Sequence, residues 1–470
     1  MRIIRIDNKG WRARFDDGFD ADNVSRVAAA FGYIWAHARP GATVYVGYDT
    51  RMLGRSLADT CARVLADCGL KVIVSSTYCP TPALGWATSE DENSCGAVML
   101  TASSASGDFG GISARASDGG PVTQGFYDAA TKIMSSVPVE GKGSYVTEDF
   151  VERYLADLRA SVDEDAIRAA GLSVVVDPMY GSGRGYLAGL LRQLGCRVHE
   201  IHGEGLPDFS GMCPMLSSPW VDKCANAVRS FDCDMGIVLD GDADRVGVFD
   251  EHGNYLTAHR LEPLIMGHLV ENRGMQGRVV ATYSSSALVR RQANRLGLEF
   301  TAVPMGFTRI YREFVEGDVM LGLEEMGGIC VPLHLPERDG LLGALLAIEA
   351  RAMAKESLSK MVERLEGDLG SMTYVKRDIE LDPSLIQAFR NILPGINPAE
   401  VCGMTPVSVA HADGLVLRFA DDSWVQLRPS RTEPLVRARA ESHDKGLAEA
   451  LGESACSAAL ARLPGRASGT

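Results

Sequence analysis

The feature that most limits the fold of this sequence is a regular alternation between short apolar runs and amphipathic stretches of helical spacing. The alternation begins with the apolar run at 43–46, which is followed by a helical stretch and the run at 71–76. It recurs from 172 to 239 and again from 278 to 325. Strands that alternate with helices of this length form parallel sheets in α/β domains. The sequence therefore predicts three similar α/β domains in series, with functional loops at the carboxyl ends of strands.

The last hundred residues follow a different pattern. Apolar and polar residues alternate between tight turns at 408–430 and 435–442, which predicts a smaller α+β domain. A chain of 470 residues has room for about three or four domains. We expect domains at 1–141, 142–252, 253–370 and 371–470.

Charge and composition exclude several classes of function. The chain has 47 basic and 61 acidic side chains, a net charge of −14, which argues against binding to nucleic acid or to an anionic membrane. No run approaches the roughly 18–20 apolar residues of a membrane span. The eleven cysteines are scattered and contain no CxxC pair, as expected for reduced thiols in a cytoplasmic protein. A small anionic substrate remains compatible with this composition.

The strongest local motif is Asp-Gly-Asp-Ala-Asp-Arg at 240–245, directly after the apolar run at 235–239. Alternating carboxylates on a loop at a strand end can converge on one hard divalent cation, and Mg²⁺ is favoured where phosphate supplies further oxygen ligands. The alternatives are a solvated acidic turn and a calcium loop of EF-hand type. An EF-hand has Glu at its twelfth position, where Glu251 stands, but a strand pattern follows here in place of a helix.

A second motif opens a small-residue loop after a buried strand. It reads Met-Leu-Thr-Ala-Ser-Ser at 99–104, and Ser103 is a candidate nucleophile or phosphoryl carrier. Serines begin many ordinary loops, and nothing here matches the Gly-x-Ser-x-Gly elbow of α/β-hydrolases.

Two further motifs carry groups suited to a phosphorylated sugar. Paired carboxylates beside glycines at 322–328 suit a loop that binds sugar hydroxyls, although acidic residues at a helix start are equally common. The segment 428–434, Arg-Pro-Ser-Arg-Thr-Glu-Pro, places two guanidinium groups and two hydroxyls between prolines. Such groups match phosphate oxygens, and the alternative is a surface turn with scattered arginines.

In this order and spacing the four motifs resemble the α-D-phosphohexomutase family, which contains phosphoglucomutases, phosphomannomutases and phosphoglucosamine mutases. The resemblance covers nearly the whole chain and includes the segments 10–12, 46–51, 81–82, 174–178 and 181–183. The segments 324–328 and 334–340 are most similar to the glucomutase-type branch. The resemblance implies four domains around a central cleft, each of which contributes one loop.

The resemblance also implies roles for individual residues. Ser103 would carry the transferable phosphoryl group, and Arg245 would lie beside it. A phosphoserine oxygen of Ser103 would complete a Mg²⁺ site formed by Asp240, Asp242 and Asp244. The sugar-binding loop would contain Glu324 and Met326, and the non-reacting phosphate would bind Arg428, Ser430, Arg431 and Thr432.

The implied reaction is an isomerisation by intramolecular phosphoryl transfer. A phosphoryl group would move between the 1- and 6-positions of a glucose or mannose phosphate through phospho-Ser103 and a sugar 1,6-bisphosphate, which is also the activator. The implied protein is a cytoplasmic monomer or homodimer whose ligand is a small hexose phosphate.

The sequence departs from the family pattern at the cleft. The family reads Thr-Ala-Ser-His-Asn-Pro at the serine loop, whereas Ser, Ala and Ser stand at 104–106 here, and Ser113 occupies the place of a usual lysine. Met326 replaces a serine, and Arg431 stands where Gly or Asn is common. Losing a positioned acid–base group typically costs about 10²–10⁴-fold in rate.

Two hypotheses follow from these departures. In one, the protein is an active mutase with a substitute proton shuttle, for which His334 and Arg115 are candidates. In the other, it is a sugar-bisphosphate phosphotransferase or a non-catalytic sugar-phosphate binder. Retention of Ser103 and all three aspartates favours chemistry. A phosphatase of the haloacid-dehalogenase type also uses Asp-x-Asp, but near the N-terminus of its core, whereas the motif lies mid-chain here.

Overall fold

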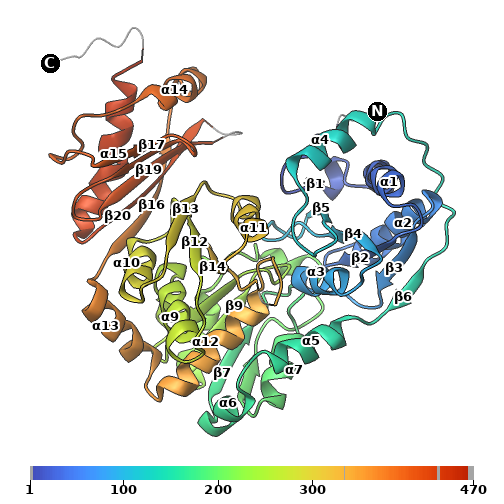
Figure 1. The fold of residues 1–470 in the computed structure, drawn as a ribbon, viewed down its shortest axis with the longest axis horizontal. Helices are drawn as coiled ribbons and strands as arrows, with labels where there is room; N and C mark the ends of the chain where they lie inside the picture. The colour runs from blue at the N-terminus through green and yellow to red at the C-terminus, as the bar shows by residue number, and fades with distance from the viewer. Residues whose placement is uncertain (1–3, 333, 431–433, 464–470) are drawn as a thin grey trace.

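The computed structural model describes residues 4–332, 334–430 and 434–463. These residues form four sheets of six, five, four and five strands, each with its own helices. In Figure 1 the first and fourth domains are the two upper lobes of a heart-shaped molecule, and the second and third domains form its base. The predicted series of three α/β domains and one α+β domain is confirmed. No helix in the described part of the chain is both long and apolar enough to cross a bilayer.

The first domain has a six-stranded sheet in the order β1-β5-β4-β2-β3-β6. Alternate residues of its central strands enter different cores: Val44 and Val46 of β2 pack under α1 and α2, whereas Tyr45 faces the other side. Its elements are β1 (Trp11–Arg14), α1 (Ala21–Ala38), β2 (Thr43–Tyr48), α2 (Gly54–Asp67), β3 (Lys71–Ser75), α3 (Thr81–Ser89), β4 (Ser94–Leu100), β5 (Phe109–Arg115), α4 (Gln124–Ile133) and β6 (Val146–Glu148).

The second domain has the strand order β11-β10-β9-β7-β8. Its elements are α5 (Val151–Ala160), α6 (Glu164–Ala170), β7 (Ser173–Asp177), α7 (Tyr186–Gln193), β8 (Arg197–Glu200), α8 (Asp222–Ser230), β9 (Met235–Leu239), β10 (Val246–Phe249) and β11 (Tyr255–Leu256). The sheets extend past the boundaries expected from sequence: β6 pairs with β3 of the first domain, and β11 pairs with β10 of the second.

The third domain has the strand order β13-β12-β14-β15. Helix α12 is apolar around most of its circumference and is buried, as expected for a helix packed on several sides. It contacts α6 and β10 of the second domain. The elements are α9 (Ala258–Glu271), β12 (Arg278–Thr282), α10 (Ala287–Arg295), β13 (Phe300–Val303), α11 (Phe307–Glu316), β14 (Val319–Glu324), β15 (Gly328–Cys330), α12 (Gly340–Ala354) and α13 (Leu358–Leu369).

The fourth domain has an antiparallel sheet in the order β16-β20-β19-β18-β17, packed against α15. The elements are β16 (Thr373–Glu380), α14 (Ile386–Ile392), β17 (Ser408–Ala410), β18 (Leu415–Arg418), β19 (Trp424–Pro429), β20 (Leu435–Ser442) and α15 (Lys445–Leu460).

The first three sheets are mixed, which corrects the prediction that they are parallel. In each of these domains one strand of the parallel part pairs antiparallel with the strand that follows it in the chain. The pairs are β4 with β5, β9 with β10, and β14 with β15. The connections are too short for the crossover helix that a parallel neighbour requires. All four predicted loops, the fourth lying between β19 and β20, therefore connect antiparallel strand pairs.

The domains differ in how they are joined. One continuous apolar core runs through the first three and includes Met99, Leu239 and Leu323. The fourth domain has a separate core. Its contacts with the third include polar ones: Arg291 Nε lies 2.9 Å from Asp422 Oδ2, and the Ala287 N–H donates to Glu441 Oε2 at 2.7 Å.

Candidate active site

The serine loop and the metal loop are in direct contact, although they come from different domains. The Ser103 hydroxyl donates to Asp240 Oδ2 at 3.2 Å. The backbone of Gly241 lies against the serine loop so closely that a Cβ at this position would be 2.3 Å from the Ser103 carbonyl oxygen. The two loops that the sequence singled out separately thus form one site, which lies at the junction of the first and second domains.

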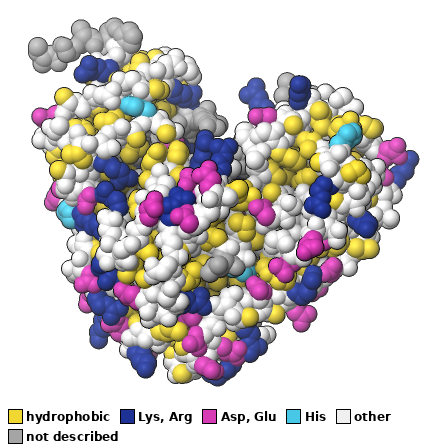
Figure 2. All heavy atoms as spheres, in the orientation of Figure 1, with side chains coloured by type: hydrophobic (Ala, Val, Ile, Leu, Met, Phe, Trp, Pro, Cys, Tyr) yellow, Lys and Arg dark blue, Asp and Glu magenta, His cyan; other side chains and the backbone are white. Residues whose placement is uncertain are grey.

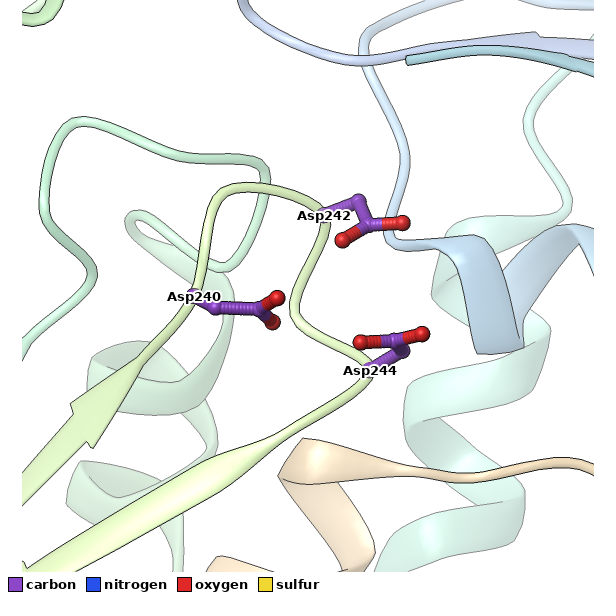
Figure 3. Close-up of side chains that lie close together, drawn as sticks. All are labelled: Asp240, Asp242 and Asp244. Atoms are coloured by element: carbon purple, nitrogen blue, oxygen red, sulfur yellow. The ribbon is translucent and has the colours of Figure 1, made fainter. Parts of the chain in front are cut away.

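The three aspartates of the metal loop converge on one point. They are buried, and one carboxylate oxygen of each lies within 4.8 Å of the others. Figure 3 shows Asp240 and Asp244 facing each other across the turn and Asp242 at its tip, beside the segment that leads into α3. The hydroxyl of Thr81, the first residue of that helix, donates to Asp242 Oδ2 at 2.8 Å.

These carboxylates fit a divalent cation. The other oxygen of Asp242, Oδ1, is buried without a hydrogen-bond partner among the described residues. Burial, together with repulsion from Asp244 and Asp242, raises the pKa of Asp240 well above its usual range even though Arg245 opposes the shift. A cation bound here would relieve this repulsion, and an all-oxygen donor set suits Mg²⁺.

Ser103 is held in a strained conformation by its own loop. Its φ is +50°, in the left-handed region that few non-glycine residues occupy. The Ser103 N–H donates to Thr101 Oγ1 at 2.8 Å, and the Thr101 hydroxyl donates to Asp49 Oδ2 at 2.7 Å. Strained residues of this kind persist where surrounding contacts fix them, and they cluster at active sites.

Arg51 supplies much of that fixation. Its guanidinium pairs with Asp49 at 2.9 Å and donates to the carbonyl oxygens of Ser103 at 2.6 Å and Ala105 at 2.7 Å. The sequence marked the segment 46–51 only as a point of resemblance. Asp49 and Arg51 directly after a buried strand were the available signal for this supporting role.

Two arginines surround the reacting oxygen and the metal loop. Arg245 Nη2 donates to Ser103 Oγ at 3.0 Å, and the same guanidinium pairs with Asp240 and Asp244. Arg338, which sequence reasoning missed, lies 2.6 Å from Asp244 Oδ2 and 2.8 Å from Glu324 Oε2. Burial opposes ionisation of Asp244, but Arg338 and Arg245 outweigh it and lower the pKa of that carboxyl.

Arg338 brings the third loop to the first two. Glu324 ends β14 and faces the metal loop through Arg338, whereas Glu325 turns the other way and pairs with Arg439 of β20 at 2.9 Å. The turn between β14 and β15 replaces the alternative of a helix start. The third residue of the turn, Met326, has its sulfur 3.1 Å from Lys376 Nζ on β16.

The fourth loop is described in part. Arg428 ends in contact with the sulfur of Met305 in the third domain, and Ser430 is buried with its N–H donating to the Leu435 carbonyl at 2.9 Å. Arg431 and Thr432 lie outside the described residues. Figure 2 shows a notch between the two upper lobes, with basic and acidic side chains on its floor.

The two candidate proton shuttles are committed to other partners. His334 has Nδ1 2.9 Å from Asp157 Oδ2 and Nε2 3.0 Å from Asp339 Oδ2, so neither ring nitrogen is available. Asp339 caps α12, which gives His334 a structural role. Arg115 lies 3.3 Å from Glu337 Oε2.

Comparisons with known proteins agree with this architecture. Models described as phosphoglucomutase/phosphomannomutase α/β/α domains I, II and III match residues 5–138, 152–253 and 259–367. A solved structure of a phosphomannomutase-type protein from Thermus thermophilus is 31% identical, with a TM-score of 0.85 over 97% of this chain and 98% of that chain. The chain belongs to the phosphoglucomutase/phosphomannomutase family.

Curated relatives cover nearly the full length of this phosphohexomutase. A phosphoglucomutase/phosphomannomutase of Thermococcus kodakarensis is 28% identical over 428 residues, which are 89% of this chain and 91% of the relative. A phosphoglucosamine mutase of Novosphingobium aromaticivorans is 26% identical over 96% of this chain and 97% of the relative. The chain is accordingly an isomerase that acts by phosphoryl transfer, and the alternative of a non-catalytic binder is not favoured.

Proposed function

We propose that this phosphohexomutase interconverts the 1- and 6-phosphates of glucose or mannose through phospho-Ser103, with Mg²⁺ held by Asp240, Asp242 and Asp244. The observation that supports the proposal most directly is the position of Ser103 Oγ. It donates to Asp240 Oδ2 at 3.2 Å and accepts from Arg245 Nη2 at 3.0 Å. A phosphoryl group on this oxygen would lie between the carboxylates of a cation site and a guanidinium group.

When bound, Mg²⁺ supplies neutralisation of the charge on the phosphoryl oxygens, which is a large part of catalysis in phosphoryl transfer. The chain's own residues position the reactants. In one half-reaction the bond between phosphorus and Ser103 Oγ breaks, a bond to a free sugar hydroxyl forms, and the hydroxyl proton ends on Ser103 Oγ. Arg245 neutralises charge that develops on this oxygen as the ester bond breaks.

The product of this half-reaction is a sugar 1,6-bisphosphate. The bisphosphate turns over in the cleft, and the second half-reaction returns its other phosphoryl group to Ser103. Glu324, oriented by Arg338 at 2.8 Å, would accept hydrogen bonds from the sugar hydroxyls, with Met326 beside it. The loop with Arg428, Ser430, Arg431 and Thr432 would hold the phosphate that is not reacting in either orientation.

The test is intact-protein mass spectrometry with Mg²⁺ and glucose 1,6-bisphosphate. The wild-type protein should gain the mass of one phosphoryl group, and Ser103→Ala should gain none. A panel of hexose 1-phosphates, assayed for the 6-phosphate with catalytic bisphosphate present, then identifies the preferred sugar. Absence of a phosphoryl adduct with every sugar bisphosphate tried would refute the proposal.

We further infer that the chain divides into four domains, with the first two boundaries moved from 141 and 252 to just after β6 and just after β11, and the third near residue 370. The same inference includes a cytoplasmic location and a monomer or homodimer. Size-exclusion chromatography with light scattering measures the oligomeric state, and limited proteolysis locates the exposed boundaries.

A further inference from the structure

The N-terminal turn at 7–10 packs against β5 of the first domain. It is closed by hydrogen bonds from the Asp7 N–H to the Gly10 carbonyl at 3.1 Å and from the Gly10 N–H to the Asp7 carbonyl at 3.0 Å. A Cβ on Gly10 would lie 2.2 Å from the Ile112 carbonyl oxygen and 2.9 Å from Ser113 Cα. The turn therefore lies directly against β5, and its position is fixed by close backbone contact.

The same turn lies across from the third domain. A Cβ built on Gly306, which precedes α11, would be 3.9 Å from Asn8 Nδ2. Lys9 is the next residue of the turn, so its side chain starts at the place where the first domain faces the third. Strand β5, against which the turn lies, follows the serine loop directly along the chain.

The charges around Lys9 belong to the transfer site. The ionised groups that act electrostatically on its ammonium are one carboxylate, Glu324, and three cations, Arg12, Arg245 and Arg338. Desolvation in the cleft, opposed by Glu324 and reinforced by the three arginines, lowers the pKa of Lys9. The Lys9 ammonium makes no hydrogen bond or ion pair with the part of the chain that is described, and its side chain is accessible to solvent. Arg245 and Arg338 are already paired with carboxylates of the metal loop and the sugar loop, whereas the Lys9 ammonium has no such partner among the described residues and is available to an anion.

The serine loop itself brings no cation to this place. Residues 101–114 contain no lysine, arginine or histidine. Ser113, against which the turn packs, contributes only a hydroxyl. Positive charge for a phosphoryl group on Ser103 must therefore come from other segments, and the turn at 7–10 is one that reaches β5.

We propose that Lys9 is a catalytic residue that contacts the phosphoryl group in transit between Ser103 and the sugar. This proposal rests on the proposed mutase function of the same site. An ammonium group offers three rotatable donors on a flexible stem, so it can follow the phosphoryl oxygens as the group moves. It adds positive charge at a point that Arg245, tied to Asp240 and Asp244, does not supply.

The experiment measures the single-turnover rate at which glucose 1,6-bisphosphate phosphorylates Ser103, by rapid quench and intact mass. Lys9→Met should slow the transfer about 10²-fold, as the loss of one charge-stabilising donor does elsewhere. Lys9→Arg should recover much of that loss. The matched control is Lys71→Met. Lys71 is exposed at the start of β3, which is separated from β5 by β4 and β2 in the same sheet, and this variant should stay within about twofold of wild type.

Readouts other than rate separate a catalytic role from a structural one. Lys9→Met should keep the wild-type thermal midpoint and the wild-type Mg²⁺ affinity, measured by a thermal-shift titration. A transfer rate unchanged in Lys9→Met, in protein whose wild-type form is phosphorylated, overturns the role of Lys9 alone. A slowed rate with a lowered thermal midpoint that Lys9→Arg does not restore overturns it too. Wild-type protein that is never phosphorylated overturns the proposed function, and the role of Lys9 falls with it.

Discussion

Replacement of Gly241 by alanine tests how tightly the metal loop and the serine loop must fit. Gly241 has an ordinary backbone conformation, so an alanine meets only the steric conflict. The new Cβ would lie 2.3 Å from the Ser103 carbonyl oxygen, whereas ordinary contact begins near 3.4 Å, so the loops must separate by about 1 Å. The hydrogen bond from Ser103 Oγ to Asp240, now 3.2 Å, would then be lost.

A displacement of about 1 Å at reacting groups can cost on the order of 10²-fold in rate. We therefore expect Gly241→Ala to lower kcat by about that factor in a coupled assay for the hexose 6-phosphate. Gly189→Ala is the control, because Gly189 lies in α7 of the same domain with no atom near its added Cβ. That variant should keep full activity and be slightly more stable, since alanine favours a helix over glycine by roughly 0.5–1 kcal/mol. Activity within twofold of wild type in Gly241→Ala would show that the loops need not touch for transfer.

Three further predictions concern stability and metal. Glu262 is fully buried, both of its carboxyl oxygens lack a hydrogen-bond partner among the described residues, and burial raises its pKa well above the usual range. Unfolding then releases a proton above pH 4.5, so Glu262→Gln should gain stability relative to wild type as the pH rises from 5 to 8 in urea titrations; a constant difference would contradict this. Although burial of His334 opposes its protonation, Asp339 and Asp157 raise its pKa. The ion pairs of the protonated ring therefore contribute fully to the free energy of unfolding below about pH 6.5, and this contribution is lost at higher pH. The stability gap between wild type and His334→Gln should therefore shrink from pH 6 to pH 9, and a gap that widens would refute the ion-pair role. Chelation with EDTA should abolish phosphoryl transfer. Mg²⁺ at 100 times its Kd should stabilise the wild type by about 2.7 kcal/mol and should not stabilise Asp242→Asn. Equal stabilisation of both proteins would show that the cation binds at another site.

The sequence predicted elements best where local pattern and local chemistry coincided. The run at 235–239 is a buried strand, β9, and the carboxylates that follow it converge as expected, because both properties depend on neighbouring residues. Likewise the alternation of apolar runs and helical stretches predicted three α/β domains. The apolar pattern could not distinguish a parallel neighbour from an antiparallel one, so the return strands were missed.

Roles that depend on contacts between distant segments were not visible in the sequence. Arg338 joins Asp244 of the second domain to Glu324 of the third, and nothing in its local sequence indicates either partner. His334 was a candidate proton shuttle, although a histidine in such a place is more often structural, and its partner Asp157 lies far away in sequence. Lys9 was not singled out from the sequence, although the segment 10–12 that follows it was a point of resemblance. The close approach of Gly10 to β5 is a property of the folded chain.

The polar contacts between the third and fourth domains determine where this molecule can open. Separating the first three domains would expose side chains such as Leu239 and Leu323, which are fully buried. Separating the fourth would exchange ion pairs such as Arg291–Asp422 and Arg439–Glu325 for hydrated ions, and its own core would stay closed. Dissolved salt screens partly exposed pairs such as Arg291–Asp422 and leaves apolar contacts in place. We therefore expect ionic strength to weaken the contact between the third and fourth domains more than the contacts among the first three.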